Sequence, residues 1–326
     1  MFEQTDPATV ERRFGRVAAF TLTELLISMG VLVLLVLLFT QLLNSAATTT
    51  TLGHKQMDAD SQAREVLDRM AVDFAQMVKR PDVDYYLKSS AGTATDCGVC
   101  SAQIGNDQAA FYSTVASYYP TVPTPAPGYT DKSPVSLLSY RVNSATGSSS
   151  YDRMERLGKG LAWNGFNSSW TPVLFLPQTI GGPQPIGGIW PSAVSSSATD
   201  SSYEIIAPQV FRFEYYYLLK TGRFSATPWD TGVSHNTVNG MRDIAAVIAD
   251  IAVIDPKSKM VVSVSQMEQL AGTNGQSSVL VDYSTGMTPG QLLANWRTAL
   301  DANTIGLPRP AISGIRVYER YFYLTH

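Results

Sequence analysis

An almost unbroken apolar run near the start of the chain, residues 20–43, constrains the fold more than any other feature. Its sequence is FTLTELLISMGVLVLLVLLFTQLL, and Glu24 is its only charged side chain. At 1.5 Å rise per residue, a helix of about 20 apolar residues spans the ~30 Å hydrocarbon core of a bilayer. The run therefore predicts a transmembrane helix, and a chain with one such helix is expected to cross the membrane once.

The basic residues around this run predict its orientation. Arg12, Arg13 and Arg16 lie just before it, and no Lys or Arg follows until Lys55. Loops on the cytoplasmic side of a membrane are enriched in Lys and Arg. We therefore expect residues 1–19 in the cytoplasm and the large C-terminal part on the other side of the membrane.

Composition and motifs narrow the function. The chain of 326 residues has a formal net charge of −3 and only 16% charged residues, so no basic surface for nucleic acid is expected. It contains no G-x-S-x-G, P-loop or H-E-x-x-H motif, and its three histidines are far apart. We expect no enzymatic activity, no cofactor and no metal site.

The two cysteines, Cys97 and Cys100, lie in the loop sequence ATDCGVCSAQ. In an oxidising compartment such a pair predicts a short disulfide loop. Two alternatives remain open. A thioredoxin-like redox site needs the pair at the start of a helix in a βαβ setting, and a tetrahedral zinc site needs two more ligands.

The small residues before the apolar run are the second informative feature of the N-terminus. A secretory signal has its cleavage site after the apolar region, whereas here Ala18 and Ala19 precede it. Cleavage at that point would remove only the leader and leave the apolar helix on the mature protein.

This arrangement, with the sequence RVAAFTLTELLISMGVLVLL, resembles the prepilin class, which includes type IV pilins and the pseudopilins of type II secretion. The resemblance implies cleavage between Ala19 and Phe20 by a prepilin peptidase, followed by N-methylation of Phe20. Leu22, Glu24 and Leu25 fit the family pattern F-T-L-x-E-L. The family normally has Gly before the cut, and this chain has Ala19.

Glu24 would be the fifth residue of the mature chain. The resemblance implies that its carboxylate neutralises the terminal amine of a neighbouring subunit during assembly. A carboxylate in a membrane helix costs about 2.5–3.5 kcal/mol on insertion scales, so such residues usually have a partner or a function. The alternative is that Glu24 extends to the cytoplasmic headgroups of an ordinary signal anchor.

The next segment, residues 44–80, predicts an amphipathic stem helix. It opens with NSAATTTTLG, where four β-branched threonines favour a weak or locally melted stretch. From about Lys55 to Arg80 the chain shows a helical repeat, which Pro81 ends. The apolar face consists of Ala63, Val66, Leu67, Met70, Phe74, Met77 and Val78. The face expected to be solvated consists of Arg64, Glu65, Asp68, Arg69 and Asp73.

The remaining residues, 81–326, predict a β-rich head with long loops. Short apolar or alternating segments predict strands over 135–142, 172–177, 209–220 and 312–324. Within the third segment, odd-numbered side chains share one face and even-numbered ones the other.

Other parts of the head are less distinct. The run 241–255 fits a buried strand or a short helix, and MVVSV at 260–264 favours a strand. Thr288 as N-cap and Pro289 in the first turn predict a helix. Its apolar side consists of Leu292, Leu293, Trp296 and Leu300. The aromatic patch at 111–120 is expected to cover a loop, the alternative being a partner surface.

The resemblance implies an α+β, pilin-like fold in which a long N-terminal helix packs its second half on an antiparallel sheet. The chain then divides into a leader (1–19), a transmembrane assembly helix (20–43), a stem helix (44–80) and an exported head (81–326). The layout of the head resembles the large J-type minor pseudopilins. Its aromatic ending, IRVYERYFYL, and its length also resemble the prepilin-like proteins of the Verru_Chthon cassette.

These features together predict a minor subunit of a type II secretion or type IV pilus-like filament or of its tip complex. Its expected partners are other prepilin-like subunits, the prepilin peptidase and the inner-membrane assembly platform. Its expected location is the inner (cytoplasmic) membrane, with the head periplasmic or otherwise extracytoplasmic. The alternative is a signal-anchored periplasmic protein for binding or adhesion that no prepilin peptidase processes.

Overall fold

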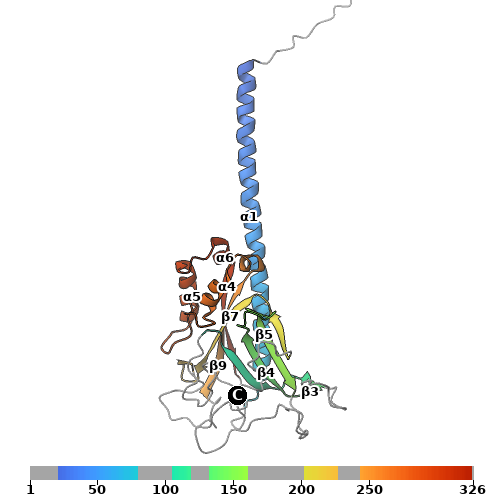
Figure 1. Ribbon diagram of the computed structural model, residues 1–326, viewed down its shortest axis with the longest axis vertical. Helices are drawn as coiled ribbons and strands as arrows, with labels where there is room; N and C mark the ends of the chain where they lie inside the picture. Colours follow the sequence, from blue (N-terminus) through green and yellow to red (C-terminus); the bar gives the residue numbers. More distant parts are fainter. Residues whose placement is uncertain (1–20, 80–104, 119–131, 161–201, 227–242, 325–326) are drawn as a thin grey trace, which may run out of the picture. The chain divides into compact units, whose positions relative to one another are not determined.

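The computed structural model describes residues 21–79, 105–118, 132–160, 202–226 and 243–324. These residues form an α+β structure with one long N-terminal apolar helix and antiparallel sheets (Figure 1). The chain divides into two compact units, Met1–Gly53 and His54–His326. The predicted strand at 172–177 lies outside the described residues.

Helix α1 (Leu22–Ala75) is continuous through the threonine-rich segment. The prediction of a locally melted stretch there is wrong for this structure. The hydroxyls of Thr48, Thr49, Thr50 and Thr51 each donate to the carbonyl oxygen four residues earlier, at 2.8–3.0 Å. These bonds give each β-branched side chain a hydrogen-bond partner within the helix.

The helix ends at Ala75, five residues before the expected end at Arg80. Its carboxyl end is set by pairing with strand β1 (Gln108–Ser113) rather than by the proline. Met77 forms an antiparallel bridge with Ser113, and the Val78 amide donates to the carbonyl of Tyr112 at 2.8 Å. The chain therefore leaves the helix to join the sheet.

The second part of α1 buries the face that the periodicity predicts. Ala63, Val66, Leu67, Met70, Phe74 and Met77 are all buried, and Val78 is partly buried. The expectation of a wholly solvated opposite face is wrong at one position, because Asp73 is 0% exposed. Asp73 follows Met70 by three residues and precedes Met77 by four, which places it within the buried stripe.

Four strands form the first sheet, in the order β1-β4-β5-β6. Strand β4 (Ser136–Val142) confirms the strand predicted at 135–142, and it pairs with both β1 and β5 (Met154–Gly160). Strand β6 (Tyr203–Ala207) completes the sheet, while β2 (Ser117–Tyr118) and β3 (Lys132–Ser133) form a separate ladder.

The aromatic patch at 111–120 contributes to this sheet and to its core. Phe111 and Tyr112 lie in β1, and each is 2% exposed. The prediction that the patch covers a loop is therefore wrong at these positions. Phe111 stacks on Phe74 of α1 with ring centroids 4.7 Å apart.

The second sheet has the order β10-β9-β7-β8. Strand β7 (Val210–Leu219) confirms the strand predicted at 209–220, and β9 (Ile244–Ile254) shows that the apolar run 241–255 forms a strand. The edge strands are β8 (Phe224–Ser225) and β10 (Ile315–Tyr323).

Strand β7 departs from the predicted alternation at one residue. A register shift between Val210 and Arg212 turns Phe211 to the face opposite Phe213. The two faces of β7 pack in different cores, so neither face of this strand is solvated.

Between β9 and β10, the described chain forms four short helices: α3 (Pro256–Lys259), α4 (Val264–Ala271), α5 (Gln291–Ala302) and α6 (Arg309–Gly314). The predicted strand at 260–264 is wrong, because Ser263 and Gln266 form a capping box that starts α4. The predicted N-cap at Thr288 is wrong, because α5 starts at Gln291 with Gly290 as its N-cap. Of the predicted strand 312–324, residues 312–314 belong to α6 and residues 315–323 form β10.

The unit His54–His326 has two hydrophobic cores, one on each side of the second sheet. The first lies between this sheet, the second part of α1 and the first sheet. The second lies between this sheet and helices α4 and α5, and Trp296 is fully buried within it. Figure 1 shows these helices on one side of β7 and β9 and strands β4 and β5 on the other.

Candidate functional site: the first turn of the long helix

Seven of the predicted site residues lie outside the described residues: Arg12, Arg13, Arg16, Ala19, Phe20, Cys97 and Cys100. The three others, Leu22, Glu24 and Leu25, lie together in the first turn of α1. Leu22 is 82% exposed and Leu25 is 53% exposed. The predicted assembly residues therefore share one exposed helix end.

The apolar surface of α1 continues beyond this turn. Within the described ranges, α1 is the one helix long and apolar enough to cross a membrane. Its exposed large apolar side chains before Asn44 include Leu26, Ile27, Met29, Val31, Leu32, Val33, Leu34, Leu35, Val36, Leu37, Leu38, Phe39, Leu42 and Leu43. Contiguous apolar surface of this extent needs a lipid or protein environment.

Glu24 forms a capping box with Thr21. Oε2 of Glu24 accepts hydrogen bonds from the backbone amide and from the hydroxyl of Thr21, each at 3.0 Å. In return, the Thr21 hydroxyl oxygen accepts from the Glu24 amide at 3.3 Å. This reciprocal pair satisfies helix N-terminal amides that have no partner within the helix.

The capping box assigns Glu24 a local role that sequence reasoning missed. The signal was present, because Thr21-x-x-Glu24 has the T-x-x-E spacing of a capping box. A carboxylate at this end of a helix is also stabilised by the helix dipole. The local role needs no second subunit, so any intermolecular role of the charge must be separated from it experimentally.

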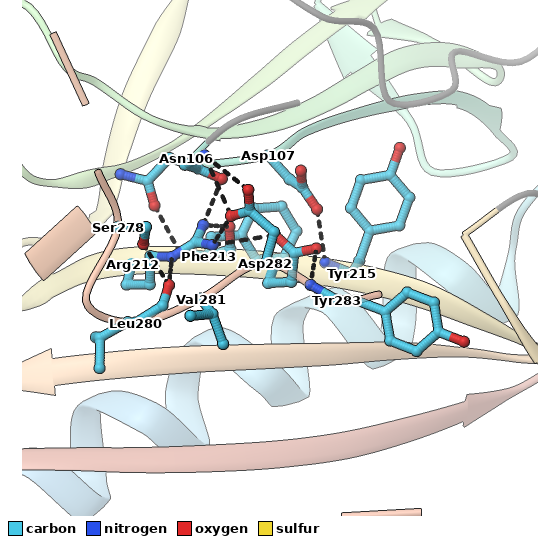
Figure 2. A network of polar contacts seen from close by, with 12 residues as sticks. Asn106, Asp107, Arg212, Phe213, Tyr215, Ser278, Leu280, Val281, Asp282 and Tyr283 are labelled. Carbon is cyan, nitrogen blue, oxygen red and sulfur yellow. Dashed lines mark hydrogen bonds and ion pairs between the residues drawn. The ribbon is translucent and has the colours of Figure 1, made fainter. Parts of the chain in front are cut away.

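A second polar site lies in the head, around Arg212 on β7 (Figure 2). The Arg212 side chain is fully buried, and all five of its N–H donors have acceptors. Nε donates to the carbonyl of Leu280, and Nη1 donates to those of Gly105 and Phe213. Nη2 donates to the carboxylates of Glu214 and Asp282.

Because every N–H group of the Arg212 side chain already has an acceptor within the protein, none is available to bind a ligand. Its guanidinium carbon also lies 5.4 Å from the ring centroid of Trp296 on α5. Figure 2 shows residues from β7, from the segment before β1 and from the segment at 278–283 converging on this side chain. We conclude that Arg212 joins three distant segments of the chain and serves the fold.

Asn106 and Asp107 extend the same network along the edge of β7. The side chain of Asn106 donates to the Phe211 carbonyl at 3.0 Å and accepts from the Phe213 amide at 2.8 Å. Asp107 accepts from the Tyr215 amide at 2.8 Å. These side chains bind backbone groups that a neighbouring strand would otherwise bind.

Three carboxylates lie in register across the second sheet. Asp250 on β9 is paired with Glu214 on β7 and with Glu319 on β10. Glu319 accepts from the hydroxyl of Tyr216 at 2.9 Å and from that of Tyr321 at 3.3 Å. Burial, followed by the nearby carboxylates, raises the pKa of both tyrosines, that of Tyr321 to about 12, so both hydroxyls remain donors at neutral pH.

The carboxylates of this row are not arranged as a metal site. No three His, Cys, Asp or Glu side chains in the described part of the chain are arranged to hold a metal ion. Glu214 is already bound by Arg212 and by the amide of Tyr283.

No protein-family model matches this chain, and no curated protein matches it significantly. The fold and the sites above therefore carry the functional argument. They define a protein with one N-terminal helix able to span a membrane and an α+β head built on antiparallel sheets.

Proposed function

We propose that this chain is a minor prepilin-like (pseudopilin) subunit of a type II secretion or type IV pilus-like system. One observation supports this most directly. Glu24, the only ionisable side chain between Leu22 and Leu43, lies in the first turn of an exposed apolar helix. If the chain is cut before Phe20, Glu24 is the fifth residue of the mature protein.

The proposed pathway has three steps. Arg12, Arg13 and Arg16 keep the leader in the cytoplasm. A prepilin peptidase then cuts between Ala19 and Phe20 and methylates the new amino group. The freed helix packs against other prepilin-like subunits at an inner-membrane assembly platform, with the head outside the cytoplasm.

The proposed contact joins the Glu24 carboxylate to the amino terminus of a neighbouring subunit. In the capping box, both bonds from Thr21 go to Oε2. A carboxylate has about four acceptor positions, so Oε1 can accept from an ammonium while the cap remains in place. An ion pair formed in hydrocarbon is far less screened than one in water.

The head fits a subunit at a filament tip. Together with the second part of α1 it forms a unit of 273 residues, His54–His326, which contains two four-stranded sheets. A head of this size would crowd a tight helical array, whereas a tip position leaves it room. In this proposal the protein has no enzymatic activity and acts through assembly.

The experiment separates the charge of Glu24 from its cap. Gln can occupy the third position of a capping box, so Glu24→Gln keeps the cap and removes the charge. Thr21→Ala weakens the cap and keeps the charge, while Glu24→Ala removes both. Each variant is cross-linked in membranes, and the prepilin-like chains that co-purify are quantified. Resistance to carbonate extraction serves as the control for membrane insertion.

We expect all three variants to insert. Association should fall at least tenfold in Glu24→Gln and Glu24→Ala and remain close to wild type in Thr21→Ala. If Glu24→Gln associates as well as the wild type, the charge has no role in assembly and the proposed contact is wrong.

The capping box also favours a second candidate, because it explains Glu24 without a partner. In that case the chain is a signal-anchored extracytoplasmic protein for binding or adhesion and keeps its leader. The mass of the membrane form distinguishes the two candidates.

A further inference from the structure

The loop between β4 and β5, residues 143–153, binds to the segment that carries α3 and α4. Lys259, the last residue of α3, donates from Nζ to the backbone carbonyl of Asp152 at 2.9 Å. Asn274 follows α4 and donates from Nδ2 to the carbonyl of Ser144 at 3.3 Å. The β4–β5 loop thus connects the first sheet to α3 and to the segment after α4, the helix that packs on the second sheet.

Asp152 lies at the centre of this contact. Its side chain is 0% exposed, and its φ of 50° is in the left-handed region. Neither carboxyl oxygen has a hydrogen bond of good geometry among the described residues, although the neighbouring Tyr151 hydroxyl lies close enough to lower the pKa of the carboxyl group. A buried carboxylate without a hydrogen bond is costly, so this position favours the protonated acid.

The charged and titratable groups that face Asp152 come from three elements. Tyr151 and Arg153 are its neighbours in the loop, Lys259 comes from α3 and Glu268 from α4. Lys259 bonds the backbone of Asp152, and no ion pair joins its ammonium to the carboxyl group within 4.0 Å. Glu268 accepts from Asn274 at 2.7 Å.

We propose that Asp152 is a proton-operated latch: the β4–β5 loop stays docked on α3 and on the segment after α4 while the Asp152 carboxyl is protonated, and ionisation of this carboxyl releases the loop. The step is a simple loss of one proton to solvent. When the loop is docked, the carboxylate would be buried without hydrogen bonds. When the loop is released, the carboxylate is hydrated, so ionisation favours release.

The difference in the pKa of Asp152 between the docked and the released loop gives the direction and size of the pH effect on docking. Burial raises the pKa of Asp152 to about 6, against the opposing effect of the Lys259 ammonium and the Tyr151 hydroxyl, while Glu268 adds to the rise. An exposed aspartate has a pKa of about 3.9, so the two states differ by about two units. By linkage, docking should weaken by up to about 100-fold between pH 4 and neutral pH.

The latch is independent of the proposed assembly role. It requires only that the pH around the head changes, as it can outside the cytoplasm. Failure of the Glu24 experiment would leave the latch intact, and failure of the latch would leave the assembly proposal intact.

Hydrogen exchange followed by mass spectrometry tests the latch on the full chain in detergent. Labelling times at pH 5, 6, 7 and 8 are scaled for the intrinsic exchange rate. We expect protection of peptides from the β4–β5 loop to fall about tenfold from pH 5 to pH 8, while peptides from β9 stay constant. In Asp152→Asn, which mimics the neutral acid, loop protection should not change with pH.

Two results would overturn the proposal: loop protection that is constant with pH in the wild type, or an equal fall in Asp152→Asn. Should the variant fail to fold, a carbon-13 carboxyl titration of the wild type decides the question. A midpoint near 6 for Asp152 supports the latch, and a midpoint near 4 refutes it.

Discussion

Asp73 on α1 and Arg156 on β5 are joined by two hydrogen bonds, Nε to Oδ2 at 2.6 Å and Nη2 to Oδ1 at 3.1 Å. The Tyr140 hydroxyl on β4 donates to the same carboxylate, which is fully buried. Nearby, Phe74 stacks on Phe322 of β10 with centroids 5.1 Å apart. These contacts attach the second part of α1 to both sheets of the head.

We predict that Asp73→Ala destabilises the head by about 3–5 kcal/mol, because it leaves the mostly buried Arg156 guanidinium without its carboxylate. Urea unfolding of the full chain measures the loss. Asp68→Ala is the control on the same helix, since Asp68 pairs with Arg320 at an exposed site and should cost at most about 1 kcal/mol. Equal losses in the two variants would show that the Asp73 ion pair contributes no more than a surface pair.

Gly105 provides a second test of the head, because a side chain there would meet backbone. Its φ is 82°, and an added Cβ would lie 2.2 Å from the carbonyl oxygen of Gly272. Gly222 has the same φ of 82° with open space around it. Gly222→Ala should therefore cost only the backbone strain, about 1–2 kcal/mol.

We predict that Gly105→Ala costs at least about 2 kcal/mol more than Gly222→Ala, because overpacking adds to the strain. The displaced backbone would also pull the Gly105 carbonyl away from Arg212. The same unfolding experiment measures both variants. Equal costs would contradict the close approach of Gly105 to Gly272.

Much of the fold follows from periodicity in the sequence. The buried stripe of α1 and strands β4 and β7 were predicted from spacing alone, because each repeats over enough residues to show a period. The prediction was wrong at 260–264, where apolar residues suggested a strand. There the local capping box of Ser263 and Gln266 starts a helix.

The polar interior of the head was harder to predict. Asp73 looked like a surface residue because its partner Arg156 is 83 positions away in the sequence. Arg212 and Glu214 were predicted to share one face of the strand at 209–220, but the alternation does not indicate that this face is buried. They are buried because α4, α5 and the segment at 278–283 cover that face, and strand alternation does not reveal such a cover.

At the candidate site, the sequence pattern indicated which residues to consider but not the hydrogen bonds that Glu24 forms. It placed Leu22, Glu24 and Leu25 near the start of the apolar helix, and α1 begins at Leu22; the role of these residues in assembly stays a prediction. The capping box with Thr21 was missed because the carboxylate was considered only for contacts with a membrane or another subunit.

The stability of the head should also depend on pH through Asp152. Between pH 4 and 6 the folded chain holds a proton on Asp152 that the unfolded chain has lost, because burial raises its pKa to about 6. This contribution is therefore complete below about pH 4 and is lost as pH rises through 6. The free energy of unfolding should decrease by about 2–3 kcal/mol over that range relative to Asp152→Asn.

Unfolding of the wild type and of Asp152→Asn at matched pH values isolates this effect, because the other carboxylates are common to both. The difference between the two proteins should shrink or reverse as pH rises. A difference that is constant from pH 4 to 7 would contradict a raised pKa at Asp152.

The central claim is that α1 is an assembly helix released by a prepilin peptidase. The most direct test is the intact mass and N-terminal sequence of the membrane form, from cells with an active prepilin peptidase. We predict a chain that begins at Phe20 and carries one methyl group on its amino terminus. Recovery of an uncut chain that begins at Met1 would contradict the claim and favour a signal-anchored protein.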